Sequence, residues 1–208
     1  ERFSAASLTH GQMHSFVAPR HLALYVEGLA VRQPDSIVEK RGPRVDAPQQ
    51  AIDGFLKSTG LAREDLVTEE TPKGTFLFAR TEMKGAPTRD LLAAMVTSIL
   101  TEFPWPKSQR WGATRFRWVR PLHRINVIFD GAGLAGCLDL GGEMLAFTTA
   151  STGHYFEAPD DLDLVGIDSA AAYGALLGGA HVVVDQAARI TAIRSGAEKI
   201  AAGLRCRL

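Results

Sequence analysis

Residues 123–140, HRINVIFDGAGLAGCLDL, carry the clearest structural pattern of the chain. Two apolar runs, His123–Phe129 and Leu134–Leu140, flank Gly131-Ala132-Gly133, and glycine readily takes the positive φ that a tight turn needs. The pattern predicts two adjacent antiparallel strands joined by a hairpin. The glycines also match the dinucleotide-binding spacing, but a helix would have to begin there to receive a pyrophosphate, and the next residues read as a strand. We therefore interpret them as turn residues.

Further helices and strands are predicted on both sides of this hairpin. Apolar stripes and capping residues predict helices over 48–59, over 87–103, from Asp168 to about Leu177, and from Asp185 to the end of the chain. Apolar or β-branched runs predict strands over 75–83 and buried strands over 22–26 and 182–184, whereas 160–163 reads as an acidic turn and 1–19 as a polar terminus. This order predicts an α/β (α+β) fold, with a mixed or antiparallel sheet packed with helices.

Composition sets limits on the class of protein. The 208 residues are 46% hydrophobic and 22% charged, and no run approaches the roughly 20 apolar residues of a membrane helix. Lys plus Arg equals Asp plus Glu at 23 each, so any nucleic-acid binding has to come from local clustering of charge. The two cysteines and the lack of a signal peptide fit a reducing cytoplasm. We also expect both ends to continue in a longer protein.

The densest functional pattern lies between Trp105 and Arg124, where all three tryptophans of the chain are found. The cations of this segment, with no acidic residue among them, are Lys107, Arg110, Arg115, Arg117, Arg120 and Arg124. Cations contact phosphates and aromatic rings stack on bases, so the segment is a candidate RNA-binding site. Composition favours the alternative, in which the aromatic residues anchor a core and the arginines pair with surface carboxylates.

Histidines offer weaker candidates. His10 and His14 have helical spacing, but Gly11 lies between them and no glutamate follows as in a zinc-protease helix, so we expect no metal site. Ser151 lacks the glycines of a nucleophile elbow, and we expect no catalytic residue. Gly153-His154-Tyr155-Phe156 reads as a tight turn or, together with His123, as the lining of a cleft.

Several of these segments resemble, in order and spacing, the N-terminal half of the bacterial glycyl-tRNA synthetase β subunit. The matching motifs are APRHLAL (18–24) with VEGL (26–29), KRGP (40–43), the helix 51–60, PWPKSQRWG (104–112) leading into VRPLH (119–123), GHYF (153–156) and VVVDQ (182–186). Gln109, Trp118 and Tyr155 depart from the family pattern, and the family's first strand, with its GTEELP motif, is absent before Glu1.

The resemblance implies a role in translation, as part of an aminoacyl-tRNA synthetase. In this family the α subunit binds ATP and Mg²⁺ and forms glycyl-adenylate, while the β subunit binds and positions tRNA-Gly in an α2β2 assembly. The N-terminal β region is similar in fold to the editing-type module of the phenylalanyl-tRNA synthetase β subunit. We therefore expect a module over 1–184, the start of a helical region over 185–208, and no cofactor, membrane contact or catalysis by this segment alone.

Two alternatives remain for the module. One is an editing-like hydrolase acting on mischarged tRNA, and the other is a scaffold that docks through its last helix. Because glycine has no side chain, a tight pocket rejects larger amino acids by steric clash, so the chemical need for editing is low. The scaffold gains support from Ile190, Ile193, Ala197, Ile200 and Leu204, whose spacing leaves one apolar helix face without a partner.

Overall fold

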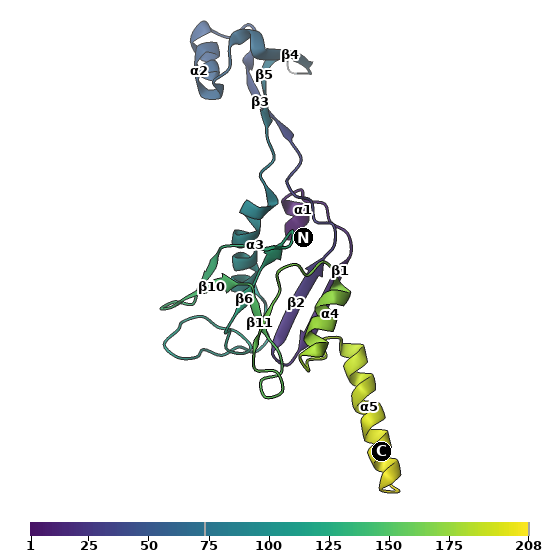
Figure 1. Cartoon of the computed structure of the whole chain (residues 1–208). Helices are drawn as coiled ribbons and strands as arrows, with labels where there is room; N and C mark the ends of the chain where they lie inside the picture. Colours follow the sequence, from purple (N-terminus) through teal and green to yellow (C-terminus); the bar gives the residue numbers. More distant parts are fainter. Residues whose placement is uncertain (73, 208) are drawn as a thin grey trace. The chain divides into compact units, whose positions relative to one another are not determined.

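The computed structural model describes residues 1–72 and 74–207, in which helices mix with short, mainly antiparallel sheets (Figure 1). The helices are α1 (Arg2–Ala5), α2 (Gln49–Thr59), α3 (Thr88–Glu102), α4 (Ala170–Gly179) and α5 (Gln186–Gly203). The strands are β1 (Met13–Ala18), β2 (His21–Val26), β3 (Ser36–Arg44), β4 (Leu66–Thr71), β5 (Gly74–Met83), β6 (Ile125–Asn126), β7 (Ile128–Phe129), β8 (Ala132–Gly133), β9 (Cys137–Asp139), β10 (Met144–Thr148), β11 (Ala150–Thr152) and β12 (Asp161–Asp163). This content confirms the predicted α+β class.

The chain forms two compact units, one made of Glu1–Val31 with Thr88–Leu208 and the other of Arg32–Pro87. The sequence pattern did not predict this second unit, which is inserted into the first. The boundary proposed at residue 185 stays a prediction, although a helix does begin there. Asp185 caps α5 because its side chain accepts a hydrogen bond from the Ala188 N–H at 2.6 Å.

The second unit is a three-stranded antiparallel sheet in the order β3-β5-β4, with α2 packed on it. Ile52 and Phe55 of α2 are buried, and a Cβ added to Gly42 would lie 2.4 Å from the Phe55 ring, so the ring rests directly on this glycine. Gly60 ends α2 at φ +70°, as its C-cap position predicted. An open depression of about 310 Å³ lies beside Arg44 and Asp46, which pair with each other at 3.1 Å.

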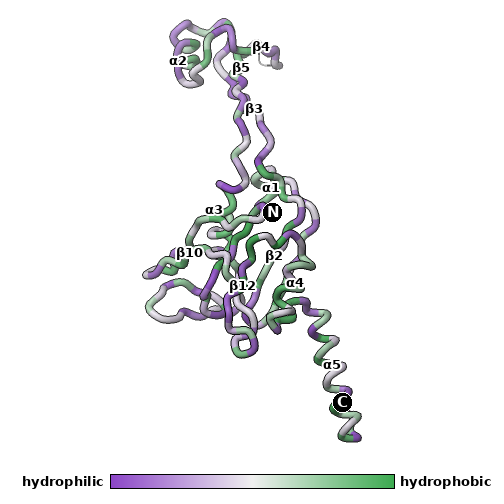
Figure 2. Tube along the Cα trace, viewed as in Figure 1, coloured by the Kyte–Doolittle hydropathy of each residue, from purple (hydrophilic) through white to green (hydrophobic). Residues whose placement is uncertain are grey.

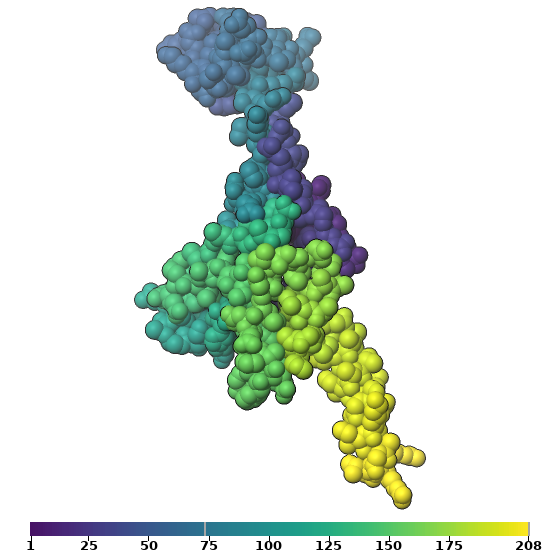
Figure 3. All heavy atoms as spheres, viewed as in Figure 1, coloured from purple at the N-terminus to yellow at the C-terminus, as the bar shows by residue number. Residues whose placement is uncertain are grey.

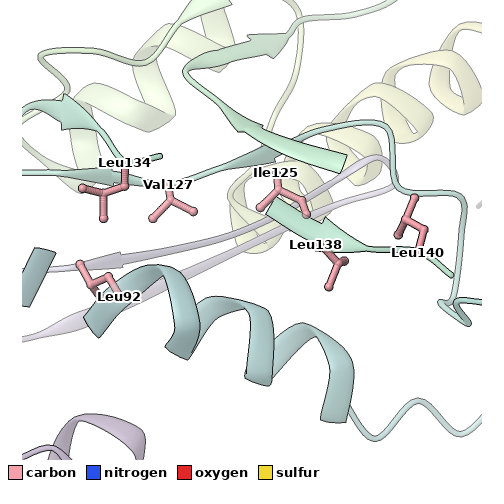
Figure 4. Close-up of a cluster of buried hydrophobic side chains, with 6 residues drawn as sticks. All are labelled: Leu92, Ile125, Val127, Leu134, Leu138 and Leu140. Atoms are coloured by element: carbon pink, nitrogen blue, oxygen red, sulfur yellow. The ribbon is translucent and has the colours of Figure 1, made fainter. Parts of the chain in front are cut away.

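The main core of the first unit lies between α3 and the strands that follow it (Figure 4). Its six buried residues are Leu92, Ile125, Val127, Leu134, Leu138 and Leu140. The predicted hairpin is confirmed, because β7 and β8 pair around Asp130 and Gly131, which have φ of 52° and 71°. The two long predicted strands are instead broken, since β6 runs parallel to β10 and β9 pairs antiparallel with β10.

A second core cluster joins α4 to the β1–β2 sheet. Ala18, Leu177 and Val184 are buried there, and the rings of Phe16 and Tyr173 lie 5.2 Å apart. Burial raises the pKa of the Tyr173 hydroxyl. β1 is not evident from the sequence, because it lies within residues 1–19, which read as a polar terminus.

Four local predictions were wrong. Strand 22–26 forms as β2, but it is not buried, because Leu22 and Leu24 are 56% and 60% exposed. Val184 is buried as predicted, but residues 182–184 form no strand, because they pair with none of the described strands. The acidic stretch 160–163 contains β12, which pairs with β11. The cap of α4 is Ser169, one residue after the predicted Asp168, and its hydroxyl accepts from the Ala172 N–H at 3.1 Å.

Candidate nucleic-acid interface

The aromatic side chains of residues 103–118 pack on one another. Trp118 is 4% exposed, and its ring lies 5.0 Å from that of Trp105 and 6.0 Å from that of Phe116. Phe103, at the end of α3, stacks on Trp105 at 4.6 Å. The structure therefore favours the interpretation of Trp118 as a core anchor, because a buried ring is not free to stack on a base, whereas Phe103 is 37% exposed and Trp105 and Phe116 are half-buried.

Backbone hydrogen bonds fix the loop that carries the cations, which we call the cationic loop (residues 107–124). Gln109 and Trp118 exchange two N–H···O bonds, at 2.8 and 3.1 Å, and so close its base. The N–H groups of Arg115 and Phe116 both donate to the Leu140 carbonyl at 2.8 Å, which ties the loop to the end of β9. The aromatic core and these bonds together hold the cations on a defined backbone.

All six predicted cations of the cationic loop are exposed. Arg117 donates to the Ser108 carbonyl at 2.8 Å and to its hydroxyl at 3.2 Å, which orients the guanidinium without neutralising it. Arg124 differs, because it pairs with Asp161 at 2.8 Å. Within the described part of the chain, no ion pair forms at Lys107, Arg110, Arg115, Arg117 or Arg120. These five cations remain available to an anion.

The predicted turn at Gly153–Phe156 is confirmed. The His154 N–H donates to the Ala180 carbonyl at 2.8 Å, and His154 Nδ1 accepts from the N–H groups of Phe156 and Glu157 at 3.4 and 3.2 Å. His154 and Tyr155 are both exposed on this turn. His123 is exposed on the cationic loop, and Ser151 is buried at 5% exposure.

Two contacts near this turn could not be found from sequence patterns. The Arg20 guanidinium lies over the Tyr155 ring, 4.9 Å from its centroid. The neighbouring His21 pairs through Nε2 with the Thr152 carbonyl at 2.8 Å. Both contacts span more than 100 residues, so local patterns carried no sign of them. Among the described residues, no group of three or more His, Cys, Asp or Glu is arranged to hold a metal ion.

The fold and the site together define an α+β module that carries, on a loop held by backbone hydrogen bonds, five cations that form no ion pair with the described residues. Comparison with known proteins makes this specific, because the family model described as "Glycyl-tRNA synthetase beta subunit" matches residues 1–208. The chain therefore belongs to the glycyl-tRNA synthetase β-subunit family, as its motifs indicated.

Curated relatives agree. The glycine–tRNA ligase beta subunit of Paracoccus denitrificans is 40% identical over 196 residues, which cover 94% of this chain and 28% of that protein. The corresponding subunit of Rhodospirillum centenum is 37% identical over 97% of this chain and 31% of its own length, and that of Hahella chejuensis is 38% identical over 97% and 29%. The chain thus spans less than a third of the length of these relatives. None of the helices described in the structure is long and apolar enough to cross a membrane.

Proposed function

We propose that this chain is a tRNA-docking module of a glycine–tRNA ligase β subunit, acting in the cytoplasm. In this proposal the cationic loop contacts the phosphates of tRNA-Gly and helps to position it, while ATP, Mg²⁺ and glycine are bound by the α subunit. The observation that carries the proposal is the set of five exposed cations without ion pairs on a backbone fixed by Trp118 and Leu140.

Phosphate contact suits this loop better than base stacking. The buried Trp118 cannot receive a base without disturbing the core, and its neighbouring rings are packed on it, whereas the guanidinium groups are exposed and need no rearrangement. A surface that is already in place loses little conformational freedom on binding. Such contacts fix the position of an RNA without reading its sequence, so identity would be read elsewhere.

We also propose that the module takes part in assembly with the α subunit in an α2β2 enzyme. The observation that favours this role is exposed apolar surface on α5, where Ile190 is 50% exposed and Ile193, Ile200 and Leu204 are 66–69% exposed. Figure 3 shows α5, in yellow, largely uncovered on the visible face, and Figure 2 shows apolar positions recurring along it. Several exposed apolar side chains along one helix are typical of a docking face.

Editing-like hydrolysis is less well supported by the geometry. A hydrolytic site needs a base and a nucleophile that converge on a substrate. His154 Nδ1 is occupied by the backbone of its own turn, and Ser151 is buried where its side chain cannot meet solvent. We therefore propose docking and not catalysis for this module.

The decisive experiment measures binding of tRNA-Gly to the folded chain by fluorescence anisotropy across a salt series. Changing Lys107, Arg110 and Arg120 together to Gln should weaken binding and reduce the slope of log K against log salt by about 0.7–0.9 for each phosphate that the variant no longer neutralises. The three residues are exposed, so thermal unfolding should not change.

The matched control changes Arg194, Lys199 and Arg205 of the α5 region to Gln, which removes the same charge from another exposed surface. Its affinity for tRNA should stay within about twofold of the wild type, because bulk charge alone contributes only a screened, long-range term. Equally weakened binding in both triple variants would reject a specific role of the cationic loop. No binding by the folded wild-type chain would reject the tRNA contact altogether.

A further inference from the structure

We infer that Arg117 is an oriented phosphate-binding group of the cationic loop, and that Ser108 is its positioning residue. Arg110, which lies across the backbone hydrogen bonds between Gln109 and Trp118, contacts the same phosphate. This inference rests on the proposed function, because the phosphate belongs to the backbone of the bound tRNA. It names the side chains that hold the phosphate and the one that orients them.

Ser108 occupies one edge of the Arg117 guanidinium. Arg117 Nε donates to the Ser108 hydroxyl at 3.2 Å, and Nη2 donates to the Ser108 carbonyl at 2.8 Å. A guanidinium has five N–H groups in one plane, and within the described residues these bonds use only two of them. The outer edge, here called the Arg117 fork, keeps one N–H on Nη1 and one on Nη2 that point the same way. Such a pair matches two oxygens of one phosphate.

Arg110 is expected on the same side of the loop as the Arg117 fork. Gln109 and Trp118 face each other across two backbone hydrogen bonds, as in an antiparallel strand pair. Side chains alternate along extended chains, so the adjacent residues Arg110 and Arg117 belong to the face opposite the buried Trp118. The bonds between Arg117 and Ser108 agree with this, because Ser108 belongs to that face too.

Two arginines at facing positions call for an anion between them. Like charges opposite each other destabilise a strand pair, and neither Arg110 nor Arg117 forms an ion pair with a described carboxylate. A phosphate bound by both guanidinium groups removes this repulsion. The loop therefore carries unfavourable charge in the free chain that the bound RNA relieves.

An RNA phosphate suits this site better than a single carboxylate of another protein. The two arginines belong to the five cations of the loop without an ion pair, and residues 107–124 contain no acidic residue. One carboxylate neutralises one charge, whereas successive phosphates of a polynucleotide neutralise the whole set. The Arg117 fork then fixes the position of the RNA backbone, and the other cations add attraction that depends less on geometry.

The test uses substitutions that conserve charge, in the same anisotropy titration with tRNA-Gly. Ser108→Ala should weaken binding about threefold to tenfold, as expected when a hydrogen bond that orients a charged group is lost. The slope of log K against log salt should fall by less than the value of about 0.7–0.9 expected for one lost phosphate contact, because no charge is removed. Ser108→Thr retains the hydroxyl and should restore affinity. Equal melting temperatures of the two variants assign the difference to RNA contact and not to folding.

Arg117→Lys should weaken binding as much as Ser108→Ala, because lysine keeps the charge but has no planar fork. If Ser108 acts through Arg117, the double variant should bind at most about twofold more weakly than either single variant, since both changes remove the same oriented group. Arg89→Lys and Ser36→Ala are the matched controls. They change the same residue types at other exposed positions and should leave tRNA affinity unchanged.

Unchanged affinity in Ser108→Ala or in Arg117→Lys overturns this inference. The proposed function still stands in that case if the triple variant of Lys107, Arg110 and Arg120 weakens binding. A double variant that loses the full product of the two single effects shows that Ser108 does not act through Arg117, and it also overturns the inference. Absence of tRNA binding by the wild-type chain overturns both the inference and the proposed function.

Discussion

The Arg124 guanidinium lies 2.8 Å from a carboxylate oxygen of Asp161, and this ion pair ties the end of the cationic loop to β12. The same guanidinium approaches the carbonyls of Ala150 and Ser151 on β11 at 3.4 Å. Arg124 therefore has partners on both strands of the β11–β12 sheet. Of the six cations predicted to contact RNA, it is the one that forms an ion pair with a described residue.

Because Arg124 forms this ion pair and Arg120 does not, we expect Arg124 to contribute to stability and Arg120 to RNA binding. Arg124→Gln should lower the free energy of unfolding by no more than about 1 kcal/mol, because both partners are partly exposed and screened by solvent, and should leave tRNA affinity unchanged. Arg120→Gln, at an exposed position without an ion pair to a described residue, should weaken tRNA binding and leave the free energy of unfolding unchanged. Thermal denaturation measures the stability of both variants, and fluorescence anisotropy measures their affinity for tRNA. A larger drop in tRNA affinity in Arg124→Gln than in Arg120→Gln would contradict it.

Trp118 should be a core residue and not a base-stacking platform. It is 4% exposed and contacts the rings of Phe103, Trp105 and Phe116, so Trp118→Ala should cost about 3–5 kcal/mol of unfolding free energy through the cavity it leaves. Urea denaturation followed by circular dichroism measures this destabilisation. Lys107→Ala, exposed on the same loop, is the control and should change stability by less than about 0.5 kcal/mol. A stable Trp118→Ala variant with weakened tRNA binding would restore the stacking interpretation.

Gly153 should tolerate no side chain. The nearest atoms to an added Cβ include the Ala180 backbone oxygen at 2.9 Å, which cannot move without shifting the end of α4. Gly153→Ala should therefore destabilise the chain by about 1–3 kcal/mol. Gly174→Ala, inside α4 with no atom within 4 Å of the new Cβ, should instead stabilise by about 0.5–1 kcal/mol. Differential scanning calorimetry compares the melting temperatures of the two variants. Equal values would contradict the prediction and mean that the turn adjusts to accept the added methyl group.

Helices with local start and stop residues could be predicted from the sequence. Gly60 ends α2, Pro104 follows α3, and Asp185 caps α5 through its own carboxylate. Each helix boundary is therefore determined by residues within one helical turn of it. The turn at Asp130–Gly131 was predictable for the same reason. Each of these features depends on backbone chemistry of neighbouring residues.

Burial and strand pairing depended on distant partners and were not predictable in the same way. The run from Leu22 to Val26 is apolar throughout, so its pattern could not show that Leu22 and Leu24 are exposed to solvent. Val184 is buried in a cluster with Leu177 of α4 and Ala18 of β1, and not by pairing as a strand. In the candidate site the RNA contact of the cations stays a prediction, and the partners Asp161 and Arg20 lie far away in sequence from the residues that they contact.

The last prediction concerns α5, which has no buried residue along its 18 positions. Most helical stability in proteins comes from packing of an apolar face, so α5 should open more readily than α3, whose Leu92 is buried in the main core. Hydrogen–deuterium exchange should show faster exchange at Ile193–Ala201 than at Leu92–Ile99. Because Gly196 has open space around it, Gly196→Ala should slow exchange in α5 alone.

A control for association is needed, since a second copy could cover the same apolar face. The exchange rates should be measured on a monomeric sample, with Ile193→Glu and Ile200→Glu as variants that keep helix propensity but remove the apolar stripe. These variants should exchange no faster than the wild type, because both isoleucines are 66% exposed in the single chain. Slow exchange in wild-type α5 that the Glu variants abolish would show that the face is already covered, and α5 would then not be a free docking surface.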